Sequence, residues 1–131
     1  ELEAGRLTGI KPEINNIPDM AKKLIELGVN SKVVIHFPTG SVCADSKGNI
    51  TALGSYVLPQ GYIKGTTGAG DAFCAGALVA INCGLSDEKI LEYGAACAAM
   101  ALATEDATGG MFDIKTALDN YKDLKRNKLC L

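Results

Sequence analysis

The sequence has 131 residues, which is enough for one domain with a substantial hydrophobic core but not for two. Its net charge of −2 argues against the strongly basic proteins that bind nucleic acids or anionic membranes through charge. Aromatic residues make up only 5% of the chain, while alanine and glycine are plentiful. This composition favours helices packed closely on a sheet over a β-sandwich of large side chains.

The five cysteines are an odd number, and no two of them have Cys-x-x-Cys spacing. Cys74, Cys83 and Cys97 fall in apolar runs of helical character. They are predicted to be small buried residues in a reducing compartment, rather than disulfide partners or zinc ligands. No signal peptide is visible, and the apolar runs at 72–83 and 94–103 are too short to span a bilayer. A cytoplasmic location is therefore expected.

Residues 1–9 have the pattern of an amphipathic helix that is already under way. A second helix is predicted to begin at Pro18, because proline suits the first helical position, and to end at Gly28. Its inner face would be formed by Met20, Leu24 and Leu27. Residues 32–37 are an apolar, β-branched run that is typical of a buried parallel strand. A helix followed by such a strand indicates a crossover, so this part of the sheet is expected to be parallel.

Two further strands are predicted at 42–45 and 50–58, joined by a hairpin turn of polar residues and glycine. We therefore expect a mostly parallel sheet that carries an antiparallel hairpin at one edge. His36, the only histidine, lies where the preceding strand ends. No catalytic partner for it is evident in the sequence, so a hydrogen-bonded structural role is expected.

Residues 65–73, Gly-Thr-Thr-Gly-Ala-Gly-Asp-Ala-Phe, lead directly into an apolar run that ends at residue 81. The first turn of a helix presents unpartnered backbone N–H groups and the positive end of the helix dipole, and glycines let a phosphate approach them. Asp71 is unusual there, because its negative charge lies beside an anion site. A base that takes a proton from a hydroxyl attacking phosphorus would occupy this position. The alternative is a plain tight turn with an acid in the first turn of the helix.

The helix at 72–81 has no charge on any face, which predicts burial on all sides, and Gly76 would let another element approach closely. Ser86 is expected to cap the next helix, which is rich in alanine and ends near residue 103. A loop at 104–110 follows, and Asp113 is expected to cap a last helix.

Residues 65–73 and the apolar helix behind them resemble the C-terminal signature of the ribokinase-like (PfkB) carbohydrate kinases, which reads close to Asp-Thr-Thr-Gly-Ala-Gly-Asp-x-Phe. The resemblance implies an α/β, ribokinase-like fold of three layers, with a mostly parallel sheet flanked by helices. Residues 1–131 would be the C-terminal, nucleotide-binding and catalytic portion of that fold, with the N-terminal part absent. On its own, this portion is expected to be inactive.

The resemblance also implies roles for individual residues. Asp71 would be the catalytic base. The anion hole for the transferred phosphoryl group would be formed by the N–H groups of Gly68, Ala69, Gly70 and Asp71. The nucleotide-binding residues would be Thr39, Gly40, Thr67 and Gly70.

Magnesium is the metal that the resemblance implies, with Glu3 acting on it through water. Glu3 would match the glutamate of the family's Asn-x-x-Glu motif if an asparagine preceded this sequence, and a solvated helix charge is the alternative. The family also holds a monovalent cation through an acid at the position of Gly65, so this chain lacks that ligand and its dependence on the cation is open. Asp106 is interpreted as a solvated loop charge rather than a replacement. Pro38 departs from the family pattern too, because it has no N–H to donate to a phosphate.

The implied reaction is transfer of the γ-phosphoryl group of ATP to a primary hydroxyl of a sugar or sugar-like molecule. No nucleic acid or membrane partner is expected, and a homodimer of the full-length protein is one option. The alternative function is that of a non-catalytic nucleotide-binding or regulatory fragment of the same fold. The intact Asp71 favours the enzyme, whereas Gly65 and Pro38 favour the alternative.

Overall fold

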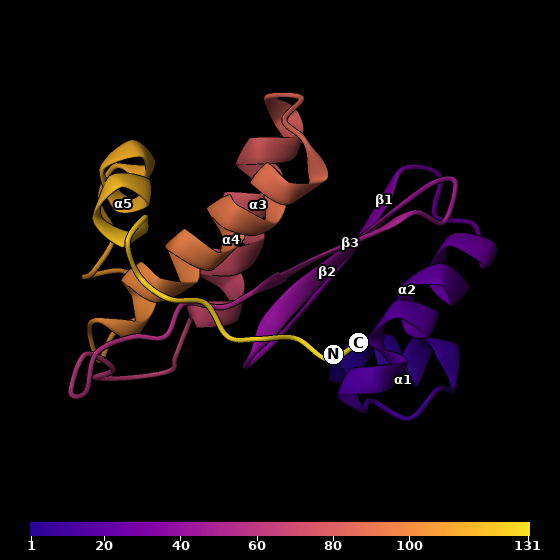
Figure 1. Cartoon of the computed structure of the whole chain (residues 1–131), viewed down its shortest axis with the longest axis horizontal. Helices are drawn as coiled ribbons and strands as arrows, with labels where there is room; N and C mark the ends of the chain where they lie inside the picture. The colour runs from indigo at the N-terminus through magenta and orange to yellow at the C-terminus, as the bar shows by residue number, and fades with distance from the viewer.

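Three strands form a sheet that lies between two layers of helices (Figure 1). The computed structural model describes all residues from 1 to 131. In chain order the elements are α1 (Leu2–Thr8), the 3₁₀ helix η1 (Ile14–Asn16), α2 (Ile17–Glu26), β1 (Lys32–Phe37), β2 (Gly40–Asp45), β3 (Ile50–Gly54), α3 (Ala69–Asn82), α4 (Asp87–Leu102) and α5 (Ile114–Tyr121). None of the helices combines the length and hydropathy that a bilayer-spanning segment needs.

The sheet has the strand order β1-β2-β3, and both pairings are antiparallel. Val34 pairs with Cys43 in the first ladder, and Cys43 pairs with Thr51 in the second. The expected hairpin is therefore present, and no parallel pairing forms among residues 1–131, where β1 is an edge strand that pairs only with β2. The two-residue turn at 38–39 can only return the chain antiparallel. A crossover also needs a strand ahead of α2, and no strand precedes that helix among residues 1–131.

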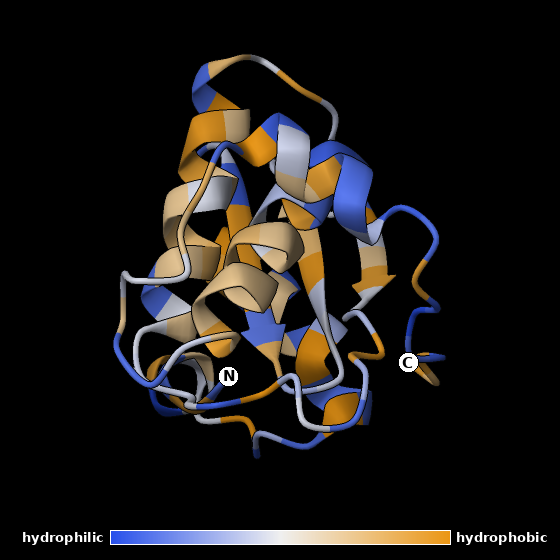
Figure 2. Cartoon of the chain, turned by 90° about the vertical axis from the view of Figure 1, so that its left-hand side faces the viewer, coloured by the Kyte–Doolittle hydropathy of each residue, from blue (hydrophilic) through white to orange (hydrophobic).

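The central strand β2 is covered on both faces. Val42 and Ala44 pack toward α2, in a cluster that also holds Ile35 of β1 and Met20 of α2. Cys43 points to the other face, where it packs among residues of α3 and α4. Figure 2 shows the largely orange strands behind the helices that face the viewer. Burial on both faces explains why this strand lacks the polar alternation of a half-exposed one.

The helices α3 and α4 pack against each other at a position where α3 has no side chain. A Cβ added to Gly76 would lie 2.6 Å from the carbonyl oxygen of Tyr93 and 2.7 Å from the Sγ of Cys97, so glycine is required for this approach. The prediction that Gly76 admits another element is thus confirmed.

The outer face of α3 is exposed, so the prediction that this helix is buried on all sides is wrong. The side chains of Leu78 and Val79 are 59% and 51% exposed, because α4 and the sheet cover only one side of the helix. Cys74 and Cys83 lie on exposed positions as well, whereas Cys43 and Cys97 are buried. The sequence could not predict this exposed face, because α3 has no charged residues along one side to mark where solvent meets the helix.

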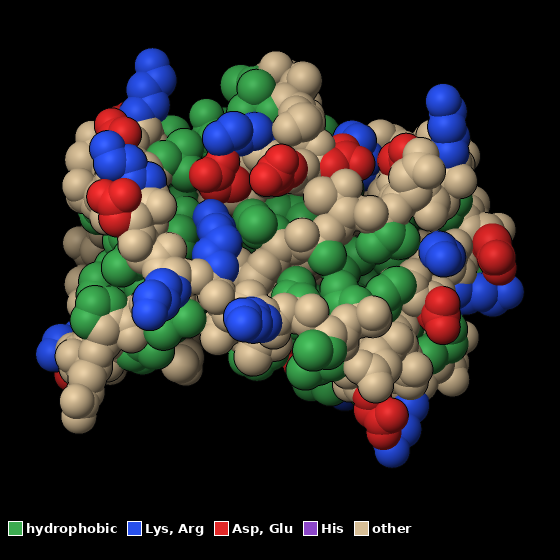
Figure 3. Space-filling model, in the orientation of Figure 1, with side chains coloured by type: hydrophobic (Ala, Val, Ile, Leu, Met, Phe, Trp, Pro, Cys, Tyr) green, Lys and Arg blue, Asp and Glu red, His purple; other side chains and the backbone are tan.

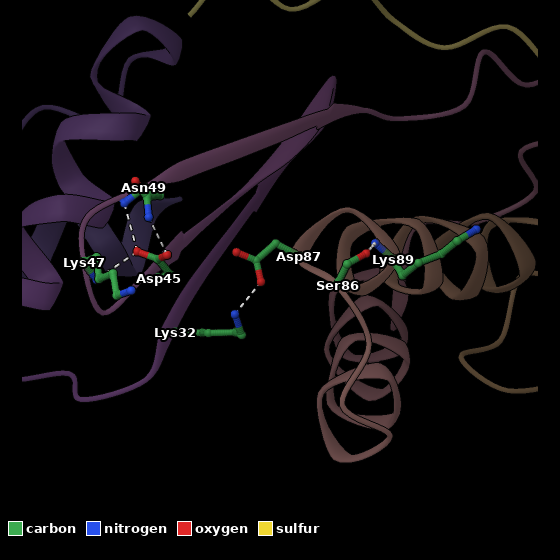
Figure 4. A network of polar contacts seen from close by, with 7 residues as sticks. All are labelled: Lys32, Asp45, Lys47, Asn49, Ser86, Asp87 and Lys89. Atoms are coloured by element: carbon green, nitrogen blue, oxygen red, sulfur yellow. Dashed lines mark hydrogen bonds and ion pairs between the residues drawn. The ribbon is translucent and has the colours of Figure 1, made fainter.

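At the end of the sheet where β1 begins, polar groups are paired with one another (Figure 4). Lys32 forms an ion pair with Asp87 in the first turn of α4. The carboxylate of Asp45 accepts backbone N–H groups of Lys47 (2.8 Å) and Asn49 (2.9 Å) in the β2–β3 hairpin turn. Elsewhere on the face of Figure 3, charges of both signs are scattered among hydrophobic side chains.

The segment after α5 returns to the sheet. Arg126 lies 4.1 Å from the ring centroid of Tyr56, and its Nη1 donates a hydrogen bond to the carbonyl of Gly54 (2.9 Å). The side chain of Asn127 donates to the Oγ of Ser55 (2.9 Å). The expected strand at 50–58 accordingly ends at Gly54, and Tyr56 forms only an isolated bridge with Arg126.

Candidate functional site

The start of α3 is built on a glycine. Gly68 is the N-cap of the helix and has a φ of 77°, in the left-handed region that residues with a Cβ rarely adopt. A Cβ at this position would also lie 2.5 Å from the Cβ of Ala107 in the loop after α4. The turn therefore needs glycine both for its backbone conformation and for its contact with that loop.

Three backbone N–H groups at this helix start have no acceptor within the chain. They belong to Gly68, Gly70 and Asp71. The N–H of Ala69 makes a long bond of 3.4 Å to the carbonyl of Thr66, and no side chain caps the helix. Unpartnered N–H groups and the positive end of the helix dipole together favour an anion.

Asp71 lies in the first turn of α3, exposed to solvent and without a hydrogen-bond or ion-pair partner within the chain. Its carboxylate is therefore free to accept a proton from a ligand beside the N–H groups. This carboxylate and these N–H groups form a cluster of acceptor and donor groups that no other part of the protein engages.

A cavity of about 640 Å³ opens beside this cluster. Its wall is mostly apolar and includes Ala95, Ala98 and Ala99 of α4, together with Tyr56 and Val57 after β3. Ala69 and Gly70 bring the start of α3 into the same wall. No lysine or arginine lines the cavity. A large apolar cavity with a few convergent polar groups is the usual form of a small-molecule site.

Helix α1 reaches this cavity from the opposite layer. The backbone nitrogen of Glu1 donates a hydrogen bond to the carbonyl of His36 (3.2 Å), and Glu3 lines the cavity. A hydrogen bond from its own backbone N–H lowers the pKa of Glu3, so its exposed carboxylate is ionised at neutral pH. No group of three or more His, Cys, Asp or Glu side chains gathers anywhere in the chain to hold a metal.

Gly65 packs tightly against the loop after α4. A Cβ there would lie 2.9 Å from the carbonyl oxygen of Thr104 and 3.0 Å from the Cα of Glu105, so no acidic side chain fits without movement of that loop. The carboxylate of Asp106 accepts the N–H groups of its own loop, from Thr108 (3.0 Å) and Gly109, and these bonds lower its pKa. Neither position therefore offers a free carboxylate to a cation in this region.

The site residues predicted from the sequence fall into two groups. Four of them line the cavity: Glu3, Gly40, Ala69 and Gly70. The others lie outside its wall: Thr39 in the β1–β2 turn, Thr67 and Gly68 before α3, and Asp71. Thr66, Phe73 and Asn127 also line the cavity, and none of them was predicted as a site residue from the sequence. No motif in the sequence around Asn127 indicates a site residue, because Asn127 reaches the cavity only where the C-terminal segment returns to the sheet.

The expectation for His36 is wrong in one respect. Its imidazole makes no hydrogen bond within the chain, so it is not a hydrogen-bonded structural histidine. The ring stacks instead on that of Phe73, with centroids 4.9 Å apart and an interplanar angle of 26°, and it lines the cavity. His36 is exposed as a residue, but the surrounding protein partly desolvates its ring, and this desolvation is the main reason why the pKa of His36 lies below the ordinary value.

Comparison with known proteins supplies a context for this site. The sequence profile described as "pfkB family carbohydrate kinase" matches residues 1–113. A ribokinase of Arabidopsis thaliana is 32% identical over 123 residues, which are 93% of this chain and 32% of that protein. The chain thus spans about one third of the length of this curated relative.

Solved structures resemble the chain in the same way. The A. thaliana ribokinase complexed with ribose and ATP superposes with a TM-score of 0.79 at 31% identity, covering 93% of this chain and 39% of that one. A ribokinase of Thermotoga maritima gives a TM-score of 0.72 at 24% identity, over 92% and 40%. An E. coli protein assigned as ribokinase II, in complex with ATP and Mg²⁺, gives 0.65 at 20% identity, over 88% and 37%. The fold is ribokinase-like.

Proposed function

Because the chain belongs to the pfkB family of carbohydrate kinases, we propose that the full-length protein transfers the γ-phosphoryl group of ATP to a hydroxyl of a sugar or sugar-like molecule. The observation that carries this proposal is the cluster at the start of α3. There the unpartnered carboxylate of Asp71 lies in the same turn as three unpartnered N–H groups, beside an apolar cavity. A free base beside an anion site is the combination that phosphoryl transfer to a hydroxyl needs.

In this proposal Asp71 accepts the proton of the substrate hydroxyl as the oxygen attacks phosphorus. The N–H groups of Gly68, Ala69, Gly70 and Asp71 stabilise the charge that develops on the phosphoryl oxygens. Three of these groups have no competing acceptor in the chain, so they need no rearrangement before they bind the anion. Removal of one such donor commonly lowers the rate by about 10²–10³.

The apolar cavity is proposed to hold the base and ribose of ATP. Its volume of about 640 Å³ and its alanine-lined wall suit a flat, largely apolar ring system. Gly40 and Gly70 lie in its wall, while Thr39 and Thr67 flank it on the two neighbouring turns. This arrangement supports a nucleotide that extends from the cavity to the start of α3.

Magnesium is proposed as the metal that accompanies ATP, where it would neutralise charge on the phosphates. The side chains present fit a metal held mainly by phosphate and water oxygens, since such sites need only one or two carboxylates. Glu3, ionised and exposed at the cavity wall, would supply that carboxylate through water. We assign no side chain to a monovalent cation, because Gly65 carries none and Asp106 is engaged by its own loop.

The proposal is tested by ADP release from the protein in its full natural length, with ATP, Mg²⁺ and a panel of sugars and nucleosides. Acceptor-dependent ADP release would support the kinase, and the best acceptor would name the substrate. A cytoplasmic location and a homodimer of the full-length protein stay predictions from the sequence. The same holds for the expected inactivity of residues 1–131 alone.

A non-catalytic nucleotide-binding protein is the second candidate function. The observation in its favour is Pro38, which lies in the cavity wall at a turn and has no N–H for a phosphate. Calorimetric titration with ATP separates the two candidates. Tight ATP binding without ADP release across the whole panel would favour the non-catalytic protein.

A further inference from the structure

His36 lies on the face of β1 that looks toward α3 and α4. Side chains of a strand alternate between its two faces. Val33, Ile35 and Phe37 belong to the cluster with α2, whereas Val34 packs in the cluster with α3 and α4. His36 shares the face of Val34 but lies one residue from the end of the strand, so its ring reaches the cavity wall.

The orientation of the His36 ring is set by a stack of contacts behind it. The ring lies on Phe73, which is only 5% exposed. Phe73 in turn packs on α4 at Gly94, where an added Cβ would lie 2.7 to 2.8 Å from three carbons of the Phe73 ring. Because Phe73 is fixed on its other side, the imidazole has a firm surface to rest on and loses little entropy on meeting a ligand.

The edge of this imidazole lies beside Gly70 at the start of α3. A Cβ added to Gly70 would be 3.2 Å from the Cε1 of His36 and 3.6 Å from its Nε2. The N–H of Gly70 has no acceptor in the chain, and neither ring nitrogen of His36 has a partner there. A ligand oxygen at Gly70 would therefore find a second, side-chain donor next to the backbone donors.

The composition of the cavity wall sets His36 apart from the other side chains that line it. Sites for phosphate groups commonly carry arginine or lysine, and no residue of either type lines this cavity. Its ionisable side chains are those of Glu1, Glu3, Tyr56 and His36. His36 is thus the only side chain of the wall that can carry a positive charge.

We propose that His36 is a phosphate-binding residue of this site. One ring nitrogen donates a hydrogen bond to a phosphate oxygen of the nucleotide, beside the N–H groups of Gly70 and Asp71. When the ring is protonated it also adds the only positive charge that a side chain of the wall can carry. This inference rests on the proposed function, in that the anion at the start of α3 is a phosphate group of ATP.

Two variants of the full-length protein test the role of His36. His36→Ala removes the donor, and His36→Gln keeps an N–H donor but cannot carry charge. Calorimetry would measure the binding of ATP, ADP and adenosine to each variant and to the unaltered protein. His36→Ala is expected to weaken ATP binding by about 3- to 10-fold, the range of one hydrogen bond, and to change adenosine binding by less than about twofold. His36→Gln is expected to recover part of the loss.

The outcomes separate this inference from the proposed function. If the unaltered protein binds ATP and both variants bind it equally well, His36 does not contact phosphate, although the nucleotide site stands. An equal loss for ATP and adenosine would show that His36 only shapes the base pocket. If the unaltered protein binds no nucleotide at all, the proposed function and this inference both fail.

An NMR titration supplies a second readout that does not depend on activity. Besides the phosphate, the charged groups around the ring are the carboxylates of Glu1 and Glu3, the amino group of Glu1, and Asp71 in the same turn as Gly70. ATP is expected to raise the pKa of the imidazole, identified by its loss in His36→Gln, whereas adenosine leaves it unchanged. An unchanged pKa with saturating ATP would overturn the inference.

Discussion

The helices α3 and α4 both begin with an acid in the first turn, yet the two helix starts differ in every polar contact. At α4 the Oγ of Ser86 accepts the N–H of Lys89 (3.4 Å), and Asp87 pairs with Lys32. At α3 the N-cap is Gly68, no side chain caps the helix, and Asp71 has no partner. The polar groups of one start are used up in holding the fold together, and those of the other are left free for a ligand.

Under the proposed function, this difference separates a start that contributes to stability from one that contributes to binding and turnover. An acid in the first turn stabilises either helix through its dipole, but only α4 adds a side-chain cap and an ion pair to that interaction. The start without a cap or an ion pair is that of α3, whose first turn borders the cavity. Substitutions of the two acids, Asp71 and Asp87, should therefore have opposite profiles.

The largest effect is expected for Asp71→Asn. Loss of the base should lower the rate of ADP release by about 10²–10⁴. The free energy of unfolding should change by less than about 1 kcal/mol, because the carboxylate contributes only its interaction with the helix dipole. ATP affinity, measured by calorimetry, should stay close to that of the unaltered protein. Turnover that survives this substitution would remove Asp71 from the role of base.

Gly68→Ala should give the next largest effect, on stability. The left-handed φ of 77° costs a residue with a Cβ about 1–2 kcal/mol, and the overlap with Ala107 adds roughly 1–3 kcal/mol. Gly84 is the matched control, since its φ is 67° but a Cβ there meets nothing within 4 Å. Urea unfolding of both variants would isolate the contact with Ala107. If both variants lose the same free energy of unfolding, the loop after α4 moves aside at no cost and the contact with Ala107 does not require glycine.

At the other helix start, Asp87→Asn should lower the free energy of unfolding by roughly 1–2 kcal/mol, between the values for exposed and buried ion pairs. Turnover should not change, because Asp87 lies outside the cavity wall. Glu88→Gln is the control within the same turn, since Glu88 forms no ion pair, and it should lose only about 0.3–1 kcal/mol of dipole interaction. A turnover defect in Asp87→Asn would break the proposed separation.

The smallest effect concerns pH and His36. Partial desolvation of the ring lowers the pKa of His36 in the folded protein below its ordinary value of 6.5. The unfolded chain therefore binds more protons at this site than the folded protein does between those two pKa values. The stabilising contribution is therefore complete above about pH 6.5 and is lost as the pH falls through the folded pKa. ATP affinity should move the opposite way, rising by about two- to fivefold as the ring gains charge. Thermal melts and calorimetry across this range, with His36→Gln as reference, would check both trends; parallel trends would contradict the assignment.

Much of this architecture was predictable because it depends on short-range chemistry. Pro18 lies in the first turn of α2, and Ser86 and Asp113 cap α4 and α5 through their side chains, as expected. The glycine turn before α3 was also identified correctly, since a left-handed residue at a helix start leaves few alternatives to glycine.

Other features depend on what lies nearby in space, and the sequence does not carry that information locally. Residues 32–37 would read the same in a parallel or an antiparallel ladder, because burial on both faces sets their pattern. Leu27 was expected on the inner face of α2 but is 60% exposed, since the helix ends one residue before it. The place of His36 beside Gly70 required the packing of β1 on α3, which no spacing within either segment reveals.

The connections within the sheet also bear on the order in which the protein folds. The strands β1, β2 and β3 are joined by short turns, so their pairing closes only small loops. The bond between Asn127 and Ser55, by contrast, joins residues 72 positions apart and completes one wall of the cavity. Since long loops close later than hairpins, we expect the sheet to form early and the ligand cavity to be the last part assembled. Pulse-labelled hydrogen exchange would then protect the strand amides before the amide of Asn127, and simultaneous protection would refute this order.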